Sequence, residues 1–287
     1  MATFCTISTQ SHLFKSFALA DSLATYGWEL KILLVDELND DHTSIEPHNV
    51  ELVSLFDMKS PRTEQALAKY KNDKLRWSLK PIFLLFLLEK YEKVIYLDND
   101  IYFFKDCKFL DEALERNNIL LTPHFYPASP LENQTWLEAN LRIGLYNAGF
   151  IGVNRKAQKA LLWWSDCCLY EMKKSYWRGL FDDQKYLDLL PILFDGVRII
   201  KDRGCNFAGW NDQIALLENE IVFIHFNQFT MSKFKINTSL YYDYFSLYIF
   251  ALKKYKPSFE LKEKQFDKFK IQNTLYYIKW NLDRLIN

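Results

Sequence analysis

The chain has 287 residues, 49% of them hydrophobic and 25% charged, which suffices for one large α/β domain or two small ones. Its formal net charge is zero, so composition gives no support for nucleic acid as a partner. The five cysteines show no metal-ligand spacing, and the N-terminus enters an apolar segment without a basic leader. These features predict a cytoplasmic protein with reduced thiols.

The first hundred residues alternate between strand and helix patterns. Strands are predicted at 3–8, 29–35, 50–55 and 94–97, and helices at 11–26, 62–70 and 79–89. Gly27 is expected to end the first helix, and Pro81 to lie in the first turn of the third. This alternation predicts an α/β fold with a mostly parallel central sheet, in which ligands bind at the carboxyl ends of strands.

The second half continues with helices predicted at 106–116, 155–170 and 181–190, and strands at 119–122, 147–154, 197–200 and 221–225. From residue 228 the composition changes to 11 Lys and Arg against 5 Asp and Glu, counted from the sequence, with many aromatic residues. We therefore expect a first domain at 1–227 and a basic, aromatic, helical extension at 228–287. No internal repeat is evident.

Two carboxylates follow the apolar run Val-Ile-Tyr-Leu at 94–97. Asp98 and Asp100 are spaced i, i+2, which in a strand points both side chains to one side. Two carboxylates held together repel each other and are costly to desolvate, and a divalent cation relieves both costs. Mg²⁺ and Mn²⁺ take oxygen ligands and often bridge carboxylates to phosphates. The pattern predicts a metal–diphosphate site; the alternative is a solvated turn.

A histidine ends a later apolar segment. His225 follows Ile-Val-Phe-Ile at 221–224, where we expect the ligand-binding edge of the parallel sheet. A lone histidine is more often structural than a metal ligand, so the residue pattern by itself leaves both interpretations open.

Five motifs in this order resemble those of GT-A glycosyltransferases, most of all glycosyltransferase family 8, which includes glycogenin and the lipopolysaccharide galactosyl- and glucosyltransferases. They are YLDND at 96–100, YNAGFIGVN at 146–154, DDQ at 182–184, CNFAGWN at 205–211 and IHF at 224–226. The resemblance covers about residues 3–230. It implies the Rossmann-like GT-A fold and the retaining transfer of a sugar from a nucleotide-diphosphate sugar, usually a UDP-sugar, with Mn²⁺ or Mg²⁺.

The resemblance also assigns roles to residues. It implies that Asp98, Asp100 and His225 ligate the metal. It places Asn147 and the pair Asp183 and Gln184 beside the transferred sugar as catalytic candidates. Further residues would bind the donor or line the donor or acceptor site: Thr6, Ser8, Asp36, Lys80, Asn99, Ala148, Gly149, Asn206, Trp210 and Asn211.

Some of these residues also have structural interpretations. Asp182 and Asp183 are predicted to open a helix, where either would serve as an N-cap. Asn147 lies in a segment that also reads as a buried strand, and Trp210 is as well suited to the core as to stacking on a sugar.

The chain departs from the family pattern after the histidine. The family has a Gly three residues later and then Lys-Pro-Trp, whereas this chain has Gln228 and then Thr-Met-Ser-Lys at 230–233. Three residues are therefore candidates for the cationic side chain that binds the diphosphate: Lys233, Lys80 and Arg76.

Other mechanisms and functions stay open at this stage. An inverting enzyme would need a base, for which Asp182 or Asp183 could serve. A sugar nucleotidyltransferase would carry a Gly-rich loop after the first strand, but residues 8–12, Ser-Thr-Gln-Ser-His, contain no glycine. A non-catalytic nucleotide-sugar-binding protein would have a degraded metal motif, and this motif is intact.

The acceptor is expected to be a carbohydrate, a lipid-linked glycan or a protein. The extension at 228–287 has three possible roles, which are a cap on the core, a contact in a homo-oligomer, and a peripheral attachment to the inner face of the membrane. The last follows from its lysines and aromatic residues, which suit an anionic bilayer surface. No apolar run is long enough to span a bilayer.

Overall fold

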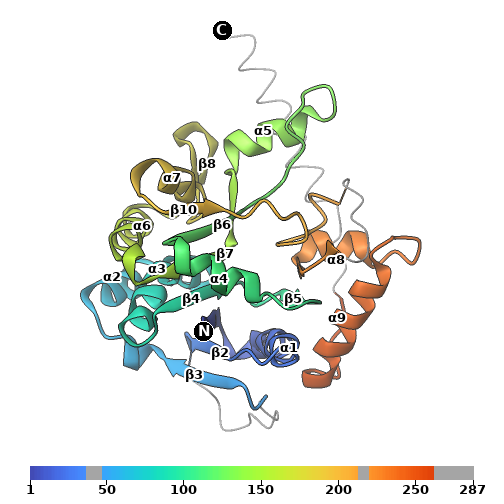
Figure 1. The fold of residues 1–287 in the computed structure, drawn as a ribbon, viewed down its shortest axis with the longest axis horizontal. Coiled ribbons are helices and arrows are strands. Elements are labelled where there is room, and N and C mark those ends of the chain that lie inside the picture. Colours follow the sequence, from blue (N-terminus) through green and yellow to red (C-terminus); the bar gives the residue numbers. More distant parts are fainter. Residues whose placement is uncertain (37–46, 213–219, 262–287) are drawn as a thin grey trace. The chain divides into compact units, whose positions relative to one another are not determined.

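The computed structural model describes residues 1–36, 47–212 and 220–261. Its centre is a seven-stranded sheet with the order β10-β6-β7-β4-β1-β2-β3 (Figure 1). All neighbouring strands are parallel except β7, which is antiparallel to both β4 and β6. The strands are β1 (Thr3–Ser8), β2 (Leu30–Leu34), β3 (Val50–Ser54), β4 (Lys93–Leu97), β6 (Ile119–Pro123), β7 (Tyr146–Asn154) and β10 (Val197–Ile199). The predicted mostly parallel α/β sheet is confirmed.

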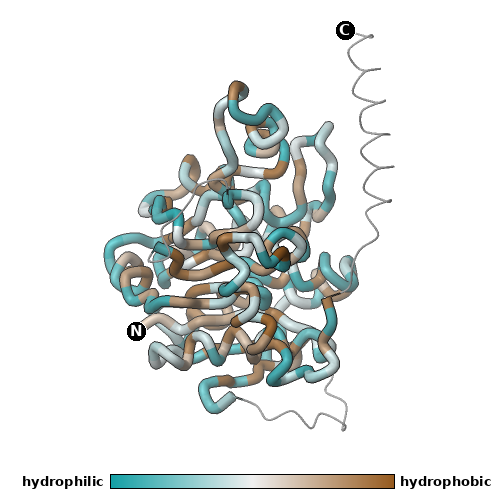
Figure 2. The backbone as a smooth tube through the Cα atoms, turned by 90° about the vertical axis from the view of Figure 1, so that its right-hand side faces the viewer, coloured by the Kyte–Doolittle hydropathy of each residue, from teal (hydrophilic) through white to brown (hydrophobic). Residues whose placement is uncertain are grey.

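Helices cover both faces of this sheet. Side chains alternate between the faces: in β4, Val94 and Tyr96 join the core on one side, and Ile95 and Leu97 join the core on the other. Both faces are therefore apolar, and hydrophobic stretches of the backbone tube run through the middle of the molecule in Figure 2. The first face packs against α2 (Pro61–Lys69), α3 (Asn72–Lys90) and α6 (Gln158–Tyr170), and the second against α1 (Leu13–Ala24) and α4 (Lys108–Arg116).

Shorter elements surround the sheet. Two small antiparallel pairs join β5 (Ile101–Phe103) to β11 (Phe223–His225) and β8 (Lys174–Ser175) to β9 (Leu180–Phe181). The remaining α-helices are α5 (Gln134–Arg142), α7 (Leu190–Leu193), α8 (Gln228–Phe234) and α9 (Tyr242–Tyr255). The 3-10 helices are η1 (Gln10–His12), η2 (Leu55–Met58), η3 (Arg155–Ala157), η4 (Tyr176–Arg178) and η5 (Lys185–Leu189).

Several local predictions need correction. Helix α3 begins at Asn72, so Pro81 lies inside the helix and not in its first turn. Residues 78–80, just before the proline, are buried, and their packing stabilises the helix despite the low helix propensity of proline. The predicted helix at 181–190 is instead a turn followed by η5, because Asp182 has a left-handed backbone with φ of 46°. Gly27 ends the first helical segment with φ of 77°, as predicted.

The strand order places a topological switch point between β1 and β4. The chain passes from β1 to β2 and β3 on one side and returns with β4 on the other side of β1. The connections after β1 and β4 therefore leave in opposite directions and open a crevice at the carboxyl ends of these two strands, where ligands bind in sheets of this kind. Ser8 and Asp98 stand at that edge.

The first part of the extension packs on the core. Tyr255 of α9 contacts Phe17 of α1 with ring centroids 5.4 Å apart, and Lys254 pairs with Asp21 at 2.6 Å. One compact unit accordingly runs from Met1 to Lys256. The rest of the predicted extension, 262–287, lies outside the described residues.

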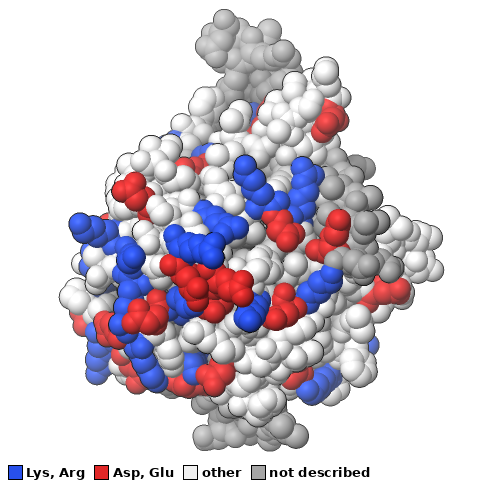
Figure 3. All heavy atoms as spheres, viewed as in Figure 1, with Lys and Arg blue, Asp and Glu red and all other residues white. Residues whose placement is uncertain are grey.

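Acidic and basic side chains are intermixed on the face drawn in Figure 3. This surface fits the formal net charge of zero. Within the described ranges, no helix combines the length and the apolar character that a bilayer crossing requires.

Candidate metal and donor site

A turn joins β4 to β5 and carries the two aspartates. The Asp98 N–H donates to the Gly149 carbonyl at 2.8 Å, and the Ile101 N–H donates back to the Asp98 carbonyl at 3.2 Å. The predicted strand geometry at 98–100 is therefore wrong, because β4 ends at Leu97 and β5 begins at Ile101. It is the turn, and not the alternation of a strand, that brings the two carboxylates to the same histidine.

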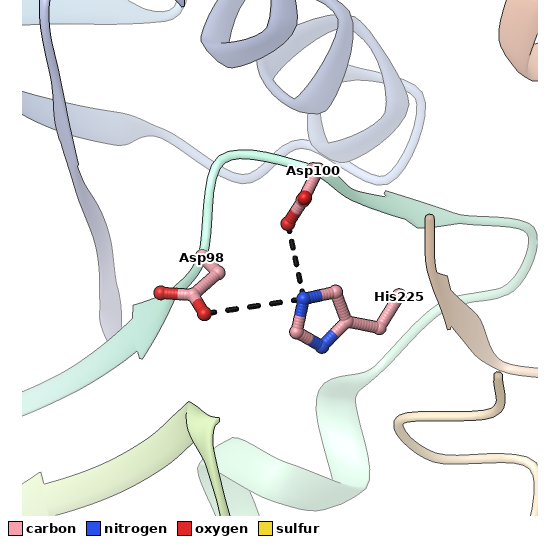
Figure 4. A group of neighbouring side chains, drawn as sticks. All are labelled: Asp98, Asp100 and His225. Carbon is pink, nitrogen blue, oxygen red and sulfur yellow. Dashed lines mark ion pairs between the residues drawn. The ribbon is translucent and has the colours of Figure 1, made fainter. Parts of the chain in front are cut away.

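That histidine comes from a distant part of the chain. His225 ends β11 and lies opposite Ile101 in the antiparallel pair with β5. The prediction that it lies at the edge of the parallel sheet is therefore wrong. Its Nε2 is 3.0 Å from Asp100 Oδ1 and 3.9 Å from Asp98 Oδ2, as Figure 4 shows. One ligand atom from each of the three residues lies within 4.8 Å of the others. We call Asp98, Asp100 and His225 the triad.

The donor set of the triad fits a divalent cation. Two carboxylates and one imidazole suit Mn²⁺ or Mg²⁺ assisted by phosphate oxygens. Burial by itself would lower the pKa of His225, but the neighbouring Asp100 carboxylate outweighs it and raises that pKa. Burial would likewise raise the pKa of Asp100, and His225 outweighs it and lowers that pKa. The carboxylates thus favour a positive charge at this position, which a metal ion would supply.

Gly149 makes room for the histidine ring. A Cβ atom at this position would lie 2.6 Å from His225 Cε1 and 2.6 Å from the Oδ1 of Asn147. Neither group could stay in place at such a distance. The predicted small residue is therefore required by the approach of His225 to the aspartates.

Lys80 is buried between two carboxylates. Its Nζ lies 3.1 Å from Asp98 Oδ1, 3.1 Å from Asp183 Oδ2 and 3.0 Å from the Ala148 carbonyl. The ammonium group thus forms ion pairs with both carboxylates and donates a hydrogen bond to the Ala148 carbonyl, so Lys80 holds Asp98 and Asp183 in place. Burial raises the pKa of Asp183 to about 6, and Lys80 offsets part of that rise.

The predicted catalytic amides form one buried network. Asn147 Oδ1 accepts from the Gly149 N–H at 2.9 Å and from Asn206 Nδ2 at 3.1 Å. Asn147 Nδ2 donates to Gln184 Oε1 at 3.3 Å, which also accepts from the Ala148 N–H at 3.3 Å. The structure thus brings together three motifs that are far apart in the sequence, at 147–149, 184 and 206.

His124 belongs to this network and was missed by the sequence analysis. Its Nδ1 donates to the Gly144 carbonyl at 2.9 Å, and its Nε2 accepts from Asn147 Nδ2 at 3.2 Å. Burial lowers the pKa of His124 to about 3, so the ring is neutral and fixes the orientation of the Asn147 amide. The available signal was its position just after the strand that ends at Pro123, at the ligand-binding edge of the sheet.

The other predicted donor residues lie in different settings. Asn99 Nδ2 is 3.4 Å from Ser8 Oγ, so these two meet at the switch point. Thr6 is buried within β1, and Asp36 accepts from the Gln10 N–H at 2.8 Å. Trp210 is buried with its ring edge-to-face against His225, at a centroid distance of 5.4 Å.

Two neighbouring residues have structural partners. Asn211 Oδ1 accepts from the Ala208 N–H at 2.8 Å and thereby shapes the turn that carries Trp210. Asp182 is buried and pairs with Lys174 at 3.4 Å.

Two curated relatives resemble this chain in sequence. They are the uncharacterized proteins YfnD and YfnF of Bacillus subtilis (strain 168). YfnD is 28% identical over 262 residues, 83% of this chain and 82% of its own length. YfnF is 27% identical over 245 residues, 79% of this chain and 81% of its own length. No protein-family model matches the chain.

Solved structures of glycosyltransferases share the fold. The galactosyltransferase LgtC, in complex with donor and acceptor sugar analogs, has a TM-score of 0.56 at 14% identity, over 93% of this chain and 99% of LgtC. GlyE of Streptococcus pneumoniae TIGR4 has a TM-score of 0.53 at 14% identity, over 92% of this chain and 66% of GlyE. Mouse xyloside xylosyltransferase 1 has a TM-score of 0.51 at 13% identity, over 80% of this chain and 98% of its own. The chain therefore has the GT-A-type fold of these glycosyltransferases.

Proposed function

We propose that this protein is a metal-dependent glycosyltransferase that uses a nucleotide-diphosphate sugar, with a UDP-hexose as the favoured donor. The acceptor would be a carbohydrate, a lipid-linked glycan or a protein. The observation that carries the proposal is the triad, which stands at the switch point of a glycosyltransferase fold beside a network of buried amides. Similarity to family 8 in the order of the five motifs supports the choice of donor.

The residues of this site divide into two groups by role. Asp98, Asp100 and His225 would hold Mn²⁺ or Mg²⁺, which when bound supplies a Lewis acid for a diphosphate leaving group. The amides of Asn147 and Gln184 are fixed by buried partners, so they can orient a sugar ring without reorganisation. A bound cation would place positive charge at the triad, and the fixed amides would present their dipoles to the sugar.

Ligand-induced stabilisation tests the donor class. UDP with Mn²⁺ is expected to raise the melting temperature. At a UDP concentration one hundred times its Kd, binding adds about 2.7 kcal/mol to the free energy of unfolding. GDP and CMP should raise it less, and EDTA should remove the UDP effect, because the diphosphate reaches the protein through the metal. Differential scanning fluorimetry measures all of these conditions. Equal shifts with all three nucleotides, or none with UDP, would contradict a UDP-sugar enzyme.

The stereochemistry is expected to be retaining, as the motif resemblance implies. In a retaining transfer the leaving phosphate can take the acceptor proton, and no side-chain base is required. NMR of the product linkage would then show the anomeric configuration of the donor. An inverted centre would instead assign the base role to Asp183 or Asp182, and the raised pKa of Asp183, about 6, would suit it to that role.

We also propose that the extension attaches the protein reversibly to a membrane surface. In its described part, α9 exposes Leu247 and Phe250, close in sequence to the exposed Lys253. Apolar side chains at the headgroup level and lysines near anionic lipids, at about 1 kcal/mol per charge, suit this role. Co-sedimentation with anionic liposomes should occur at low salt and fall as salt rises. Failure to sediment at low salt would leave the extension as a cap or an oligomer contact.

A further inference from the structure

The family pattern implies a cationic side chain at the donor diphosphate, and the three lysine and arginine candidates from the sequence are already engaged. Lys233 Nζ bonds the Gly209 carbonyl at 2.8 Å and both carboxylate oxygens of Asp212 at 2.7 and 2.9 Å. Arg76 pairs with Asp73 one helical turn away. Lys80 has three acceptors around its ammonium group, as described above. A phosphate would have to displace these partners.

A fourth cation, Lys15, stands beside the triad with its donors available. Its Nζ is 4.0 Å from Asp100 Oδ2, and its side chain is 24% exposed. Within the described ranges this long contact is its one ion pair, and its ammonium group makes no hydrogen bond there. It can therefore take a new anionic partner without breaking a short bond.

Lys15 is placed on the correct edge of the sheet. It lies in the first turn of α1, which follows β1 at the switch point and packs beside β5, the strand after Asp100 (Figure 1). That turn carries no acidic residue, and His12 at the cap position makes no capping bond with its side chain. The positive end of the helix thus adds to the lysine charge.

The neighbouring charges confirm that these groups share one environment. Burial lowers the pKa of His12, Lys15 and Arg76 lower it further, and Asp73 and Asp100 act in the opposite direction. The fields of the two cations and of Asp100 therefore overlap at the cap of α1. An anion bound between the triad and α1 would feel both cations.

We propose that Lys15 binds the diphosphate of the nucleotide-sugar donor. This inference rests on the proposed function and extends it by naming the phosphate contact that the departure after His225 leaves open. In the structure Lys15 faces the Asp100 carboxylate. A divalent ion held by the triad would balance that carboxylate, and Lys15 would then be able to pair with a phosphate oxygen. Lys15 is thus a binding residue for the diphosphate and not a ligand of the metal.

Calorimetric titrations of the full chain test this role. In the presence of Mn²⁺, Lys15→Gln should weaken UDP binding on the order of tenfold, as expected for the loss of one charge-assisted contact. Uridine, which has no phosphate, should bind both proteins equally. Mn²⁺ alone should bind Lys15→Gln as tightly as the wild type or more tightly, because a cation next to Asp100 has been removed.

Two further variants complete the design. Lys15→Arg should retain UDP affinity, and Lys108→Gln, on the exposed surface of α4, should match the wild type. Ligand-free melting temperatures establish that each variant is folded. If the wild type binds UDP in a Mn²⁺-dependent way and a folded Lys15→Gln binds it equally well, the proposed role of Lys15 is wrong. The proposed function is not affected by that result. If the wild type binds no UDP, the proposed function fails, and this inference fails with it.

Discussion

Asp100→Ala is expected to abolish Mn²⁺-dependent UDP binding and to lower sugar transfer by about 10³-fold, since a metal supplies several kcal/mol of charge stabilisation. Asp100 Oδ1 lies 3.0 Å from His225 Nε2, so its loss removes one of the three proposed metal ligands and leaves the histidine without its nearest carboxylate. The side chain is partly exposed and lies in a turn, and the fold should survive its removal. Asp98→Ala should have a similar effect on transfer with a larger cost in stability, because Asp98 also pairs with Lys80.

The measurement is the release of UDP from a panel of UDP-sugars, with and without EDTA. Asp195→Ala, which removes an exposed carboxylate before the amino end of β10, provides the matched control and should behave as the wild type. Full turnover by the wild type in excess EDTA would refute the role of the triad as a metal site. Full turnover by Asp100→Ala would refute the role of this residue.

The fold was predictable where the signal was local. The strands at 3–8, 29–35, 50–55 and 94–97 are apolar runs separated by helical patterns, and alternation of this kind leaves few topologies other than a parallel sheet. The antiparallel insertion of β7 between β4 and β6 was not visible in this way. A strand buried on both faces has the same composition in either direction, so direction is decided by partners elsewhere in the chain.

The site was predictable in its residue types but not in its geometry. Asp98 and Asp100 were identified by composition and position, although a turn and not a strand orients them. His225 reaches them through pairing of β11 with β5, which joins segments about 120 residues apart in the numbering. Such pairing is a tertiary event that no local pattern contains.

The buried polar groups were the hardest to assign from the sequence. A lysine in an apolar helix, such as Lys80, gives no sign of which carboxylates will surround it. His124 follows a short strand and a proline, and its neutral state depends on burial by residues from several elements. Partners of this kind are set by how helices and loops dock on the sheet, so they emerge only with the three-dimensional structure.

Lys80→Met is expected to destabilise the metal-free protein by about 3–5 kcal/mol at pH 8, as removal of one partner from a buried ion pair does. Methionine preserves most of the volume of the side chain, and the loss is therefore mainly electrostatic. Asp183 is buried, and its charged form would lose the cation that lies 3.1 Å away. Asp98 is partly exposed and would be less affected.

The loss of stability caused by Lys80→Met should depend on pH, and the pKa of Asp183 decides its direction. Burial raises the folded-state pKa of Asp183 to about 6 from the ordinary value of 3.8, even with Lys80 present. Between these two pKa values the native state therefore binds more protons than the unfolded state. The contribution of Asp183 to stability is thus present at low pH and is lost as the pH rises through its folded-state pKa. Without Lys80 the folded-state pKa of Asp183 rises further and extends this window upward. The deficit of Lys80→Met relative to the wild type should thus be larger at pH 8 than at pH 5.

Urea unfolding at both pH values, in EDTA, measures this difference. The double variant Lys80→Met/Asp183→Asn should recover much of the loss at pH 8, because it removes the uncompensated charge together with its partner. Asp183→Asn by itself serves as the matched single variant for the cycle. An equal deficit at pH 5 and pH 8, with no recovery in the double variant, would mean that Lys80 stabilises the fold by packing, and that the charge of Asp183 is balanced by other groups.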